Sequence, residues 1–213
     1  MSELQYYVLD TETTGFSPSN HEMVEYSIIN CSNRKQLSRI IKAEHPETAS
    51  QEALQITGKT KIDLLKGISK EEAVKDLIEF INLDRNVPEG RVIIAHNAVF
   101  DMKFCHALFR KVKKSFPVVC WLDTKALAKD WFKKQGMIQP GVKLSLKLGD
   151  CIRQAGLKGV PTEHNAKADA QNAFILWFKA MEAGIDYLHH IKRVPCGIFE
   201  EEINEMDEPG GEL

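Results

Sequence analysis

Short apolar runs separated by polar turns occupy the first half of the chain, and longer amphipathic stretches follow. Tyr6–Leu9 and Val92–Ala95 are continuous runs with the length and the branched or aromatic composition of buried strands. Met23–Asn30 and Leu37–Ala43 are joined by a turn-like cluster, and Val118–Leu122 is a further apolar run. The pattern predicts five strands, of which the first three form an antiparallel meander.

Helices are predicted where apolar residues recur at intervals of three and four. One such helix follows a capping box at 69–72, a second reaches about Lys113, and a third follows Asp123. Two more span Leu144–Ala155 and Ala166–Ala183. Asn165 can cap the last helix, and Gly156 and Gly184 follow the last two. Antiparallel strands followed by alternating strands and helices predict an α/β fold with a mixed sheet. Ligands bind such sheets beyond the carboxyl ends of the strands.

Carboxylates stand at the ends of two predicted strands. Asp10 and Glu12 are two residues apart, so strand periodicity places both side chains on one side. Two such carboxylates repel each other unless one is protonated or a cation lies between them, and Mg²⁺ prefers oxygen ligands. The alternative for this pair is a turn cap with a solvated glutamate. Asp101 follows the run at Val92–Ala95, where a helix-capping role is the alternative.

A third group of polar residues precedes and opens the last predicted helix. His164 and Asp169 are five residues apart and would point away from each other on one regular helix. They can converge only if His164 lies in the loop before the helix and Asp169 lies about one turn inside it. A histidine beside an anionic metal site is suited to accepting a proton from water near neutral pH. A surface histidine with no such role is the alternative.

Composition and charge narrow the class of protein. The chain has 213 residues with 43% hydrophobic and 27% charged residues, which fits one globular domain. It has no apolar run of roughly 18 residues, and its first residues have neither a basic start nor a long apolar stretch, so we expect no secretory signal, no membrane contact and a cytoplasmic location. The five cysteines are scattered, which indicates buried thiols. Seven acids and no basic residue lie in 200–213, which leaves a surplus of five positive charges elsewhere.

Three co-linear motifs resemble those of the DEDDh family of 3′–5′ exonucleases. This DnaQ-like group includes the proofreading ε subunit of bacterial replicative DNA polymerases. The motifs are Asp10-Thr11-Glu12-Thr13-Thr14-Gly15, His96-Asn97-Ala98-Val99-Phe100-Asp101 and His164-Asn165-Ala166-Lys167-Ala168-Asp169. Their order, spacing and context agree with the family over about Tyr6 to Met181. One departure is Thr57-Gly58, which stands where family members commonly have a histidine-glycine pair.

The resemblance implies an RNase H-like fold and catalysis with two divalent metal ions, Mg²⁺ or Mn²⁺. It implies that Asp10, Glu12 and Asp169 hold one ion, that Asp10 bridges to the second, and that Asp101 supports the second site. His164 would be the general base. Two such ions clamp the attacking and leaving oxygens of a phosphodiester hydrolysis that releases nucleoside 5′-monophosphates.

Residues within and just after the first two motifs are expected to contact the substrate. These residues are Thr13, Gly15, Phe16, Asn97 and Phe100. For Phe16, stacking on a base and packing on the sheet remain equal alternatives.

We therefore expect a 3′–5′ exonuclease domain over 1–185 that acts on single-stranded or frayed DNA ends, in proofreading or repair. The extension 186–213 is expected to end in a disordered acidic tail, a candidate tether to a partner DNA polymerase. Alternative substrates are RNA, whose 2′-OH the site would have to accept, and short oligonucleotides or nucleotides. A less favoured alternative is an inactive module that binds nucleic acid or a polymerase.

Overall fold

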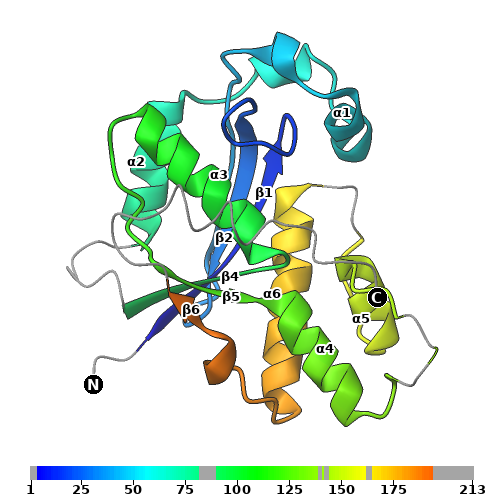
Figure 1. Ribbon diagram of the computed structural model, residues 1–213. Helices are drawn as coiled ribbons and strands as arrows, with labels where there is room; N and C mark the ends of the chain where they lie inside the picture. The colour runs from blue at the N-terminus through cyan, green and yellow to red at the C-terminus, as the bar shows by residue number, and fades with distance from the viewer. Residues whose placement is uncertain (1–3, 82–89, 139–140, 142–143, 162–164, 194–213) are drawn as a thin grey trace.

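The fold is a mixed sheet covered by helices on both faces (Figure 1). The computed structural model describes residues 4–81, 90–138, 141, 144–161 and 165–193. The strands are β1 (Gln5–Thr13), β2 (Met23–Asn30), β3 (Gln36–Ile40), β4 (Arg91–Ala95), β5 (Cys120–Asp123) and β6 (Lys192–Arg193). The helices are α1 (Gln51–Thr57), α2 (Lys70–Ile81), α3 (Ala98–Lys111), α4 (Thr124–Lys134), α5 (Leu148–Gln154) and α6 (Ala166–Glu182). Short 3-10 helices are η1 (Pro46–Thr48), η2 (Asp63–Leu65) and η4 (Leu188–His190).

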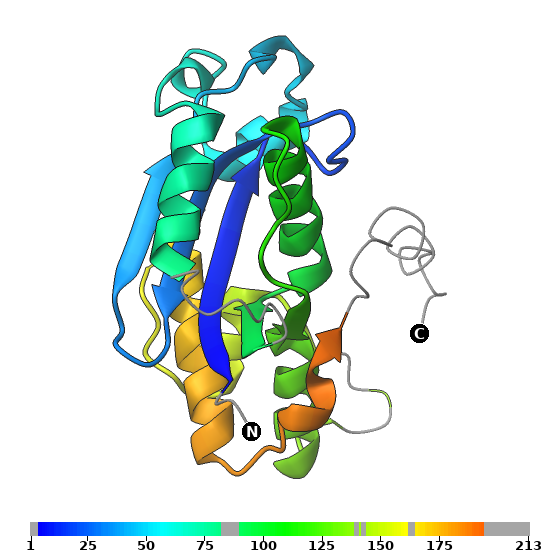
Figure 2. The same ribbon diagram turned by 90° about the vertical axis from the view of Figure 1, so that its left-hand side faces the viewer.

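The strand order is β3-β2-β1-β4-β5-β6. β1, β2 and β3 pair antiparallel, whereas β1, β4 and β5 run parallel to one another. The expected meander and mixed sheet are thereby confirmed. Because β1 and β4 are parallel neighbours, their carboxyl ends lie at the same edge of the sheet, and Figure 2 shows β1 running the length of the molecule toward that edge.

The alternating side chains of β1 pack into two separate cores. Tyr7 and Leu9 are buried with residues of α2 and α3, whereas Val8 is buried with residues of α4, α5 and α6. Both cores consist of fully or almost fully buried apolar side chains, which is the main stabilising contribution in a domain of this size. By the same alternation, Asp10 and Glu12 continue the face of Val8 and point to the side of α6.

Two predicted elements begin later than the apolar pattern indicated. The helix expected over Leu144–Ala155 starts only at Leu148, because the carbonyl of Leu146 bonds the Nε2 atom of His96, 2.7 Å away. That contact holds the preceding residues outside the helix. The strand expected to begin at Val118 begins at Cys120. β6 lies beyond residue 185, the expected end of the domain, and pairs antiparallel with β5; the proposed boundary itself stays a prediction.

The described cysteines carry free thiols, and three of the four are buried, as expected from their scattered positions. They are Cys31, Cys105, Cys120 and Cys151. Cys196 and the acidic residues of 200–213 lie outside the described residues. Within the described part of the chain, no helix combines the length and the apolar character needed to cross a bilayer.

Candidate active site

The strand β1 ends beside the first turn of α6 (Figure 1). Three carboxylates converge there. Asp10 and Glu12 come from β1, and Asp169 comes from α6, with ligand oxygens within 4.8 Å of one another. Asn165 positions the helix, because its side-chain oxygen accepts a hydrogen bond from the backbone N–H of Ala168 at 2.9 Å. The cap predicted from the sequence is thus confirmed, and Asp169 lies one turn inside the helix.

Asp101 approaches the same cluster from the opposite face of the sheet. It lies in the first turn of α3 and is only 3% exposed. Thr11, between the two carboxylates of β1, donates a hydrogen bond from Oγ1 to Asp101 Oδ1 at 2.8 Å. The strand therefore carries two acids toward α6 and holds a third acid through the residue between them.

Burial raises the pKa values of Asp10, Glu12 and Asp101, and neighbouring carboxylates add to the shift at Asp10 and Glu12. Burial, followed by Asp101, Asp169 and Glu12, raises the pKa of Asp10 well above its ordinary value. Burial and the neighbouring charges of Asp169 and Glu25 raise the pKa of Glu12 from 4.5 to about 8. Burial likewise raises the pKa of Asp101 to about 8, although the hydrogen bond from Thr11 opposes that shift.

Sequence reasoning missed Glu25, a further acid beside the cluster. It is 7% exposed on β2 and lies directly opposite Glu12 in the strand register. Its carboxylate pairs with the ammonium of Lys59 at 2.8 Å, and Lys59 also lowers the pKa of Glu12. A charged residue inside the apolar run Met23–Asn30 was the available signal, but only the pairing with β1 reveals its neighbour.

The donor set fits a divalent metal ion. All three converging ligands are carboxylate oxygens, which hard cations such as Mg²⁺ and Mn²⁺ accept. Burial, together with repulsion from the neighbouring carboxylates, raises the pKa values of Asp10 and Glu12 and disfavours their ionised forms. A cation that binds between them would supply a compensating charge.

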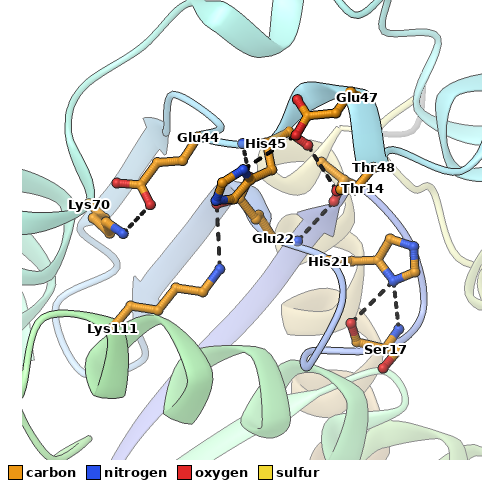
Figure 3. A network of polar contacts seen from close by, with 10 residues as sticks. All are labelled: Thr14, Ser17, His21, Glu22, Glu44, His45, Glu47, Thr48, Lys70 and Lys111. Carbon is orange, nitrogen blue, oxygen red and sulfur yellow. Dashed lines mark hydrogen bonds and ion pairs between the residues drawn. The ribbon is translucent and has the colours of Figure 1, made fainter.

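A network of polar contacts shapes the loop that follows the carboxylates (Figure 3). Thr14 and Glu22 exchange two hydrogen bonds of 2.8 Å across the loop. The carboxylate of Glu22 accepts the backbone N–H of His45 at 2.8 Å and pairs with Lys111 at 3.4 Å. Buried Glu22 therefore fastens the loop both to the segment after β3 and to α3.

The same loop requires glycine at position 15. A Cβ atom on Gly15 would lie 2.3 Å from the ring of His21, which no side chain could occupy without movement of that ring. Thr13 adds a hydrogen bond of 2.6 Å from its hydroxyl to the carbonyl of Gly15. At the outer side of this turn Phe16 is 56% exposed, so the structure does not pack it on the sheet.

The second motif is anchored to neighbouring elements. The ring of His96 makes two hydrogen bonds, from Nδ1 with Thr124 Oγ1 at 2.8 Å and from Nε2 with the carbonyl of Leu146. Burial lowers the pKa of His96. Asn97 adopts a left-handed conformation with φ 82°, and its N–H donates to Asp123, which also caps α4 as predicted. These contacts fix the start of α3, and thereby Asp101.

The remaining predicted residues are placed as follows. The side chain of Phe100 is half-buried against the core of α2 and α3, with its ring centroid 4.9 Å from that of Phe104. Asn97 is exposed. His164, the expected general base, lies outside the described residues. The structure therefore brings together Asp10, Glu12, Asp169 and Asp101, and the roles expected of the substrate-contacting residues stay predictions.

Comparison with known proteins identifies what the chain resembles. A family profile described as Exonuclease matches residues 7–176. The chain is 30% identical over 194 residues to a "DNA polymerase III PolC-type" of Thermotoga petrophila, covering 89% of the chain and 13% of that protein. It is 29% identical over 192 residues to a "DNA polymerase III subunit epsilon" of Treponema pallidum, covering 88% of the chain and 79% of that protein. It spans only 10–13% of the first PolC-type relatives.

Solved structures share the fold. The nuclease domain of 3′hExo, a DEDDh family member bound to rAMP, superposes with a TM-score of 0.66 and 15% identity over 84% of this chain and 92% of that domain. E. coli Exonuclease I in complex with a dA16 oligonucleotide superposes with a TM-score of 0.66 and 16% identity over 85% of this chain and 41% of that protein. The resemblance drawn from the three motifs and the expected RNase H-like fold are both confirmed.

Proposed function

The chain belongs to the exonuclease family, and from that premise we propose that it hydrolyses DNA from the 3′ end and releases nucleoside 5′-monophosphates. The observation that carries the proposal is the convergence of Asp10, Glu12 and Asp169 at the end of β1, with Asp101 behind them. Acids that reach the end of one strand from both faces of the sheet can hold divalent cations at a single phosphodiester group.

Each polar residue has a role in this proposal. Asp10, Glu12 and Asp169 would hold Mg²⁺ or Mn²⁺, and Asp101 would support a second ion. Bound divalent cations would stabilise the charge on the attacking and leaving oxygens of the in-line displacement. His164, by its place in the third motif, accepts the proton of the attacking water.

Five further residues would contact the terminal nucleotides. Exposed Phe16 would stack on a base, because base–aromatic stacking needs no particular sequence. Thr13 and Gly15 would present the backbone of the turn to the substrate. Asn97 would present its backbone to the substrate at the start of α3, and Phe100 would line the same side of the site.

DNA is the proposed substrate because the similar curated proteins carry DNA polymerase III names. The same relatives support a replicative DNA polymerase as partner, proofreading as the biological role, and the cytoplasm as the location. RNA as substrate is an outcome that the experiment below distinguishes.

The test is a degradation assay with the full chain. DNA and RNA single strands of equal sequence, labelled at the 5′ end, are incubated with Mg²⁺ or Mn²⁺ and with chelator. We expect a metal-dependent ladder of shortened DNA, slower shortening of RNA, and 5′-monophosphates as product. Asp169→Asn should reduce the rate at least roughly 100-fold, since even residues that only orient metal ligands contribute 10–100-fold.

Asp150→Asn is the matched control, because this acid lies on α5 and pairs with Arg153. It should degrade DNA like the wild type. Faster shortening of RNA than of DNA would make RNA the substrate in place of DNA. Binding of either strand without any degradation would refute the proposed enzymatic activity and favour an inactive module that binds nucleic acid.

A further inference from the structure

A second group of metal-type ligands lies away from the catalytic carboxylates. In the described part of the chain, two sets of histidine, cysteine or acidic side chains bring their ligand atoms within 4.8 Å of one another, and the second comprises Asp130, His189 and His190. Asp130 lies on α4, and the histidines lie in η4, just beyond the C-terminal end of α6. The catalytic acids lie at the other end of α6, whose 17 residues span roughly 25 Å.

The two imidazole rings point at one carboxylate oxygen. Asp130 Oδ2 lies 2.8 Å from Nε2 of His190 and 3.6 Å from Nε2 of His189. Ligand atoms around a tetrahedral zinc ion, with bonds of about 2.0–2.1 Å, are about 3.3 Å apart. The two measured separations lie on either side of this value, so small side-chain rotations suffice to admit an ion.

The outer nitrogen of one ring faces a second carboxylate. His189 Nδ1 lies 3.6 Å from Oδ2 of Asp186, three residues earlier in the chain. Metal-ligating histidines characteristically offer one ring nitrogen to the ion and the other to a carboxylate, which fixes the tautomer. Asp130 and Asp186 together carry two negative charges, which a doubly charged ion neutralises while both imidazoles remain uncharged.

The backbone around the cluster is fastened on both sides. Lys134, one turn beyond Asp130, donates hydrogen bonds to the carbonyls of Ala183 and Gly184 at 2.8 and 3.2 Å. Beyond the histidines, β6 pairs with β5 at the edge of the sheet (Figure 2, orange segment beside the lower part of α4). The ligands are therefore held close before any ion binds, which lowers the ordering cost of binding.

We propose that Asp130, His189 and His190 form a Zn²⁺ site that fastens the segment after α6 to α4. Two imidazoles and one carboxylate favour Zn²⁺, whereas the all-carboxylate cluster favours Mg²⁺ or Mn²⁺. The partial exposure of Asp130 and His189 leaves room for water as the fourth ligand. The ion would hold the short strand β6 in place. The proposed zinc site is independent of the nuclease function proposed above.

The test is calorimetric titration of the chelator-treated full chain with ZnCl₂ in excess Mg²⁺, which occupies the carboxylate cluster. We expect one more zinc ion per chain in the wild type than in the double variant His189→Gln/His190→Gln. The unfolding temperature of the wild type should rise with Zn²⁺, and that of the double variant should not. Asp186→Asn should weaken zinc binding by roughly 10-fold, as expected for a residue that only orients a ligand.

His45→Gln is the matched control, because His45 also faces an acid, Glu47, at 3.3 Å but belongs to no group of three metal-type ligands among the described residues. It should bind zinc like the wild type. Should the double variant fail to fold, the visible absorption of tetrahedral Co²⁺ in the wild type and in Asp130→Asn replaces it, present in the first and lost in the second. Equal zinc stoichiometry in wild type and double variant, or Co²⁺ absorption that survives Asp130→Asn, would leave only a histidine–aspartate ion pair and overturn the proposal.

Discussion

Replacing Glu12 with glutamine should stabilise the metal-free protein while weakening its response to divalent cations. Glutamine keeps the shape of the side chain and removes the charge that burial disfavours and that Asp169 and Glu25 repel. The pKa of Glu12 rises from 4.5 to about 8 on folding. A group whose pKa is raised by folding contributes stability below its unfolded pKa, and this contribution is lost as the pH rises through the folded pKa.

The magnitude follows from that shift. At 1.36 kcal/mol per pKa unit, ionised Glu12 would destabilise the metal-free fold by about 4 kcal/mol at pH 8 and by about 1 kcal/mol at pH 5. Its side chain is partly exposed, and solvent screening reduces these values to about 2 and about 0.5 kcal/mol. The stabilising effect of Glu12→Gln should therefore grow about fourfold between pH 5 and pH 8.

Urea unfolding in the presence of EDTA at the two pH values measures this difference. Glu79→Gln is the control, because Glu79 is exposed on α2 and makes only a 3.9 Å contact with Lys75. With Mg²⁺ in place of EDTA the order should reverse, because the wild type gains more from the cation. An equal gain at pH 5 and pH 8, or an equal gain in the control, would refute the reasoning that charge repulsion at Glu12 destabilises the metal-free site.

Three further outcomes are expected. Gly15→Ala should lower the free energy of unfolding by about 1–3 kcal/mol through overlap with His21, and His21→Ala should restore much of it; a neutral Gly15→Ala in urea unfolding would contradict the predicted clash. Asn165→Ala should lower it by about 1 kcal/mol and reduce nuclease activity by loosening Asp169, whereas Asn165→Asp should keep the cap; equal melting and activity in the two variants would rule this role out. Mg²⁺ should raise the melting temperature of the wild type more at pH 8 than at pH 6, because protons compete for Glu12; calorimetric scans with the opposite order would show that the ion binds elsewhere.

Local sequence signals predicted most elements of the fold. The buried strands β1, β2 and β4 correspond to the continuous apolar runs, and α2 and α6 follow their apolar spacing. Asn165 and Asp123 cap helices because capping depends only on a side chain and the next few backbone N–H groups. Such signals succeed where a structure is determined within about one turn of chain.

Other elements escaped prediction because distant residues determine them. The start of α5 depends on the bond between His96 and the carbonyl of Leu146, far away in the chain. The two residues of β6 have no pattern of their own and form a strand only because the edge of β5 is available for pairing. The exposure of Phe16 to solvent likewise depends on the loop that Glu22 fastens, and not on the residue type.

The sequence by itself determined that acids follow the ends of two strands and open a capped helix, and these spacings sufficed to indicate the family. Only the tertiary structure decided that Asp10, Glu12 and Asp169 lie within 4.8 Å, and that Glu25 with Lys59 stands beside them. It also brought Asp130 to the two histidines of η4. The reason is that charge interactions depend on distance and burial, which residues remote in the chain acquire only when the sheet and its helices assemble.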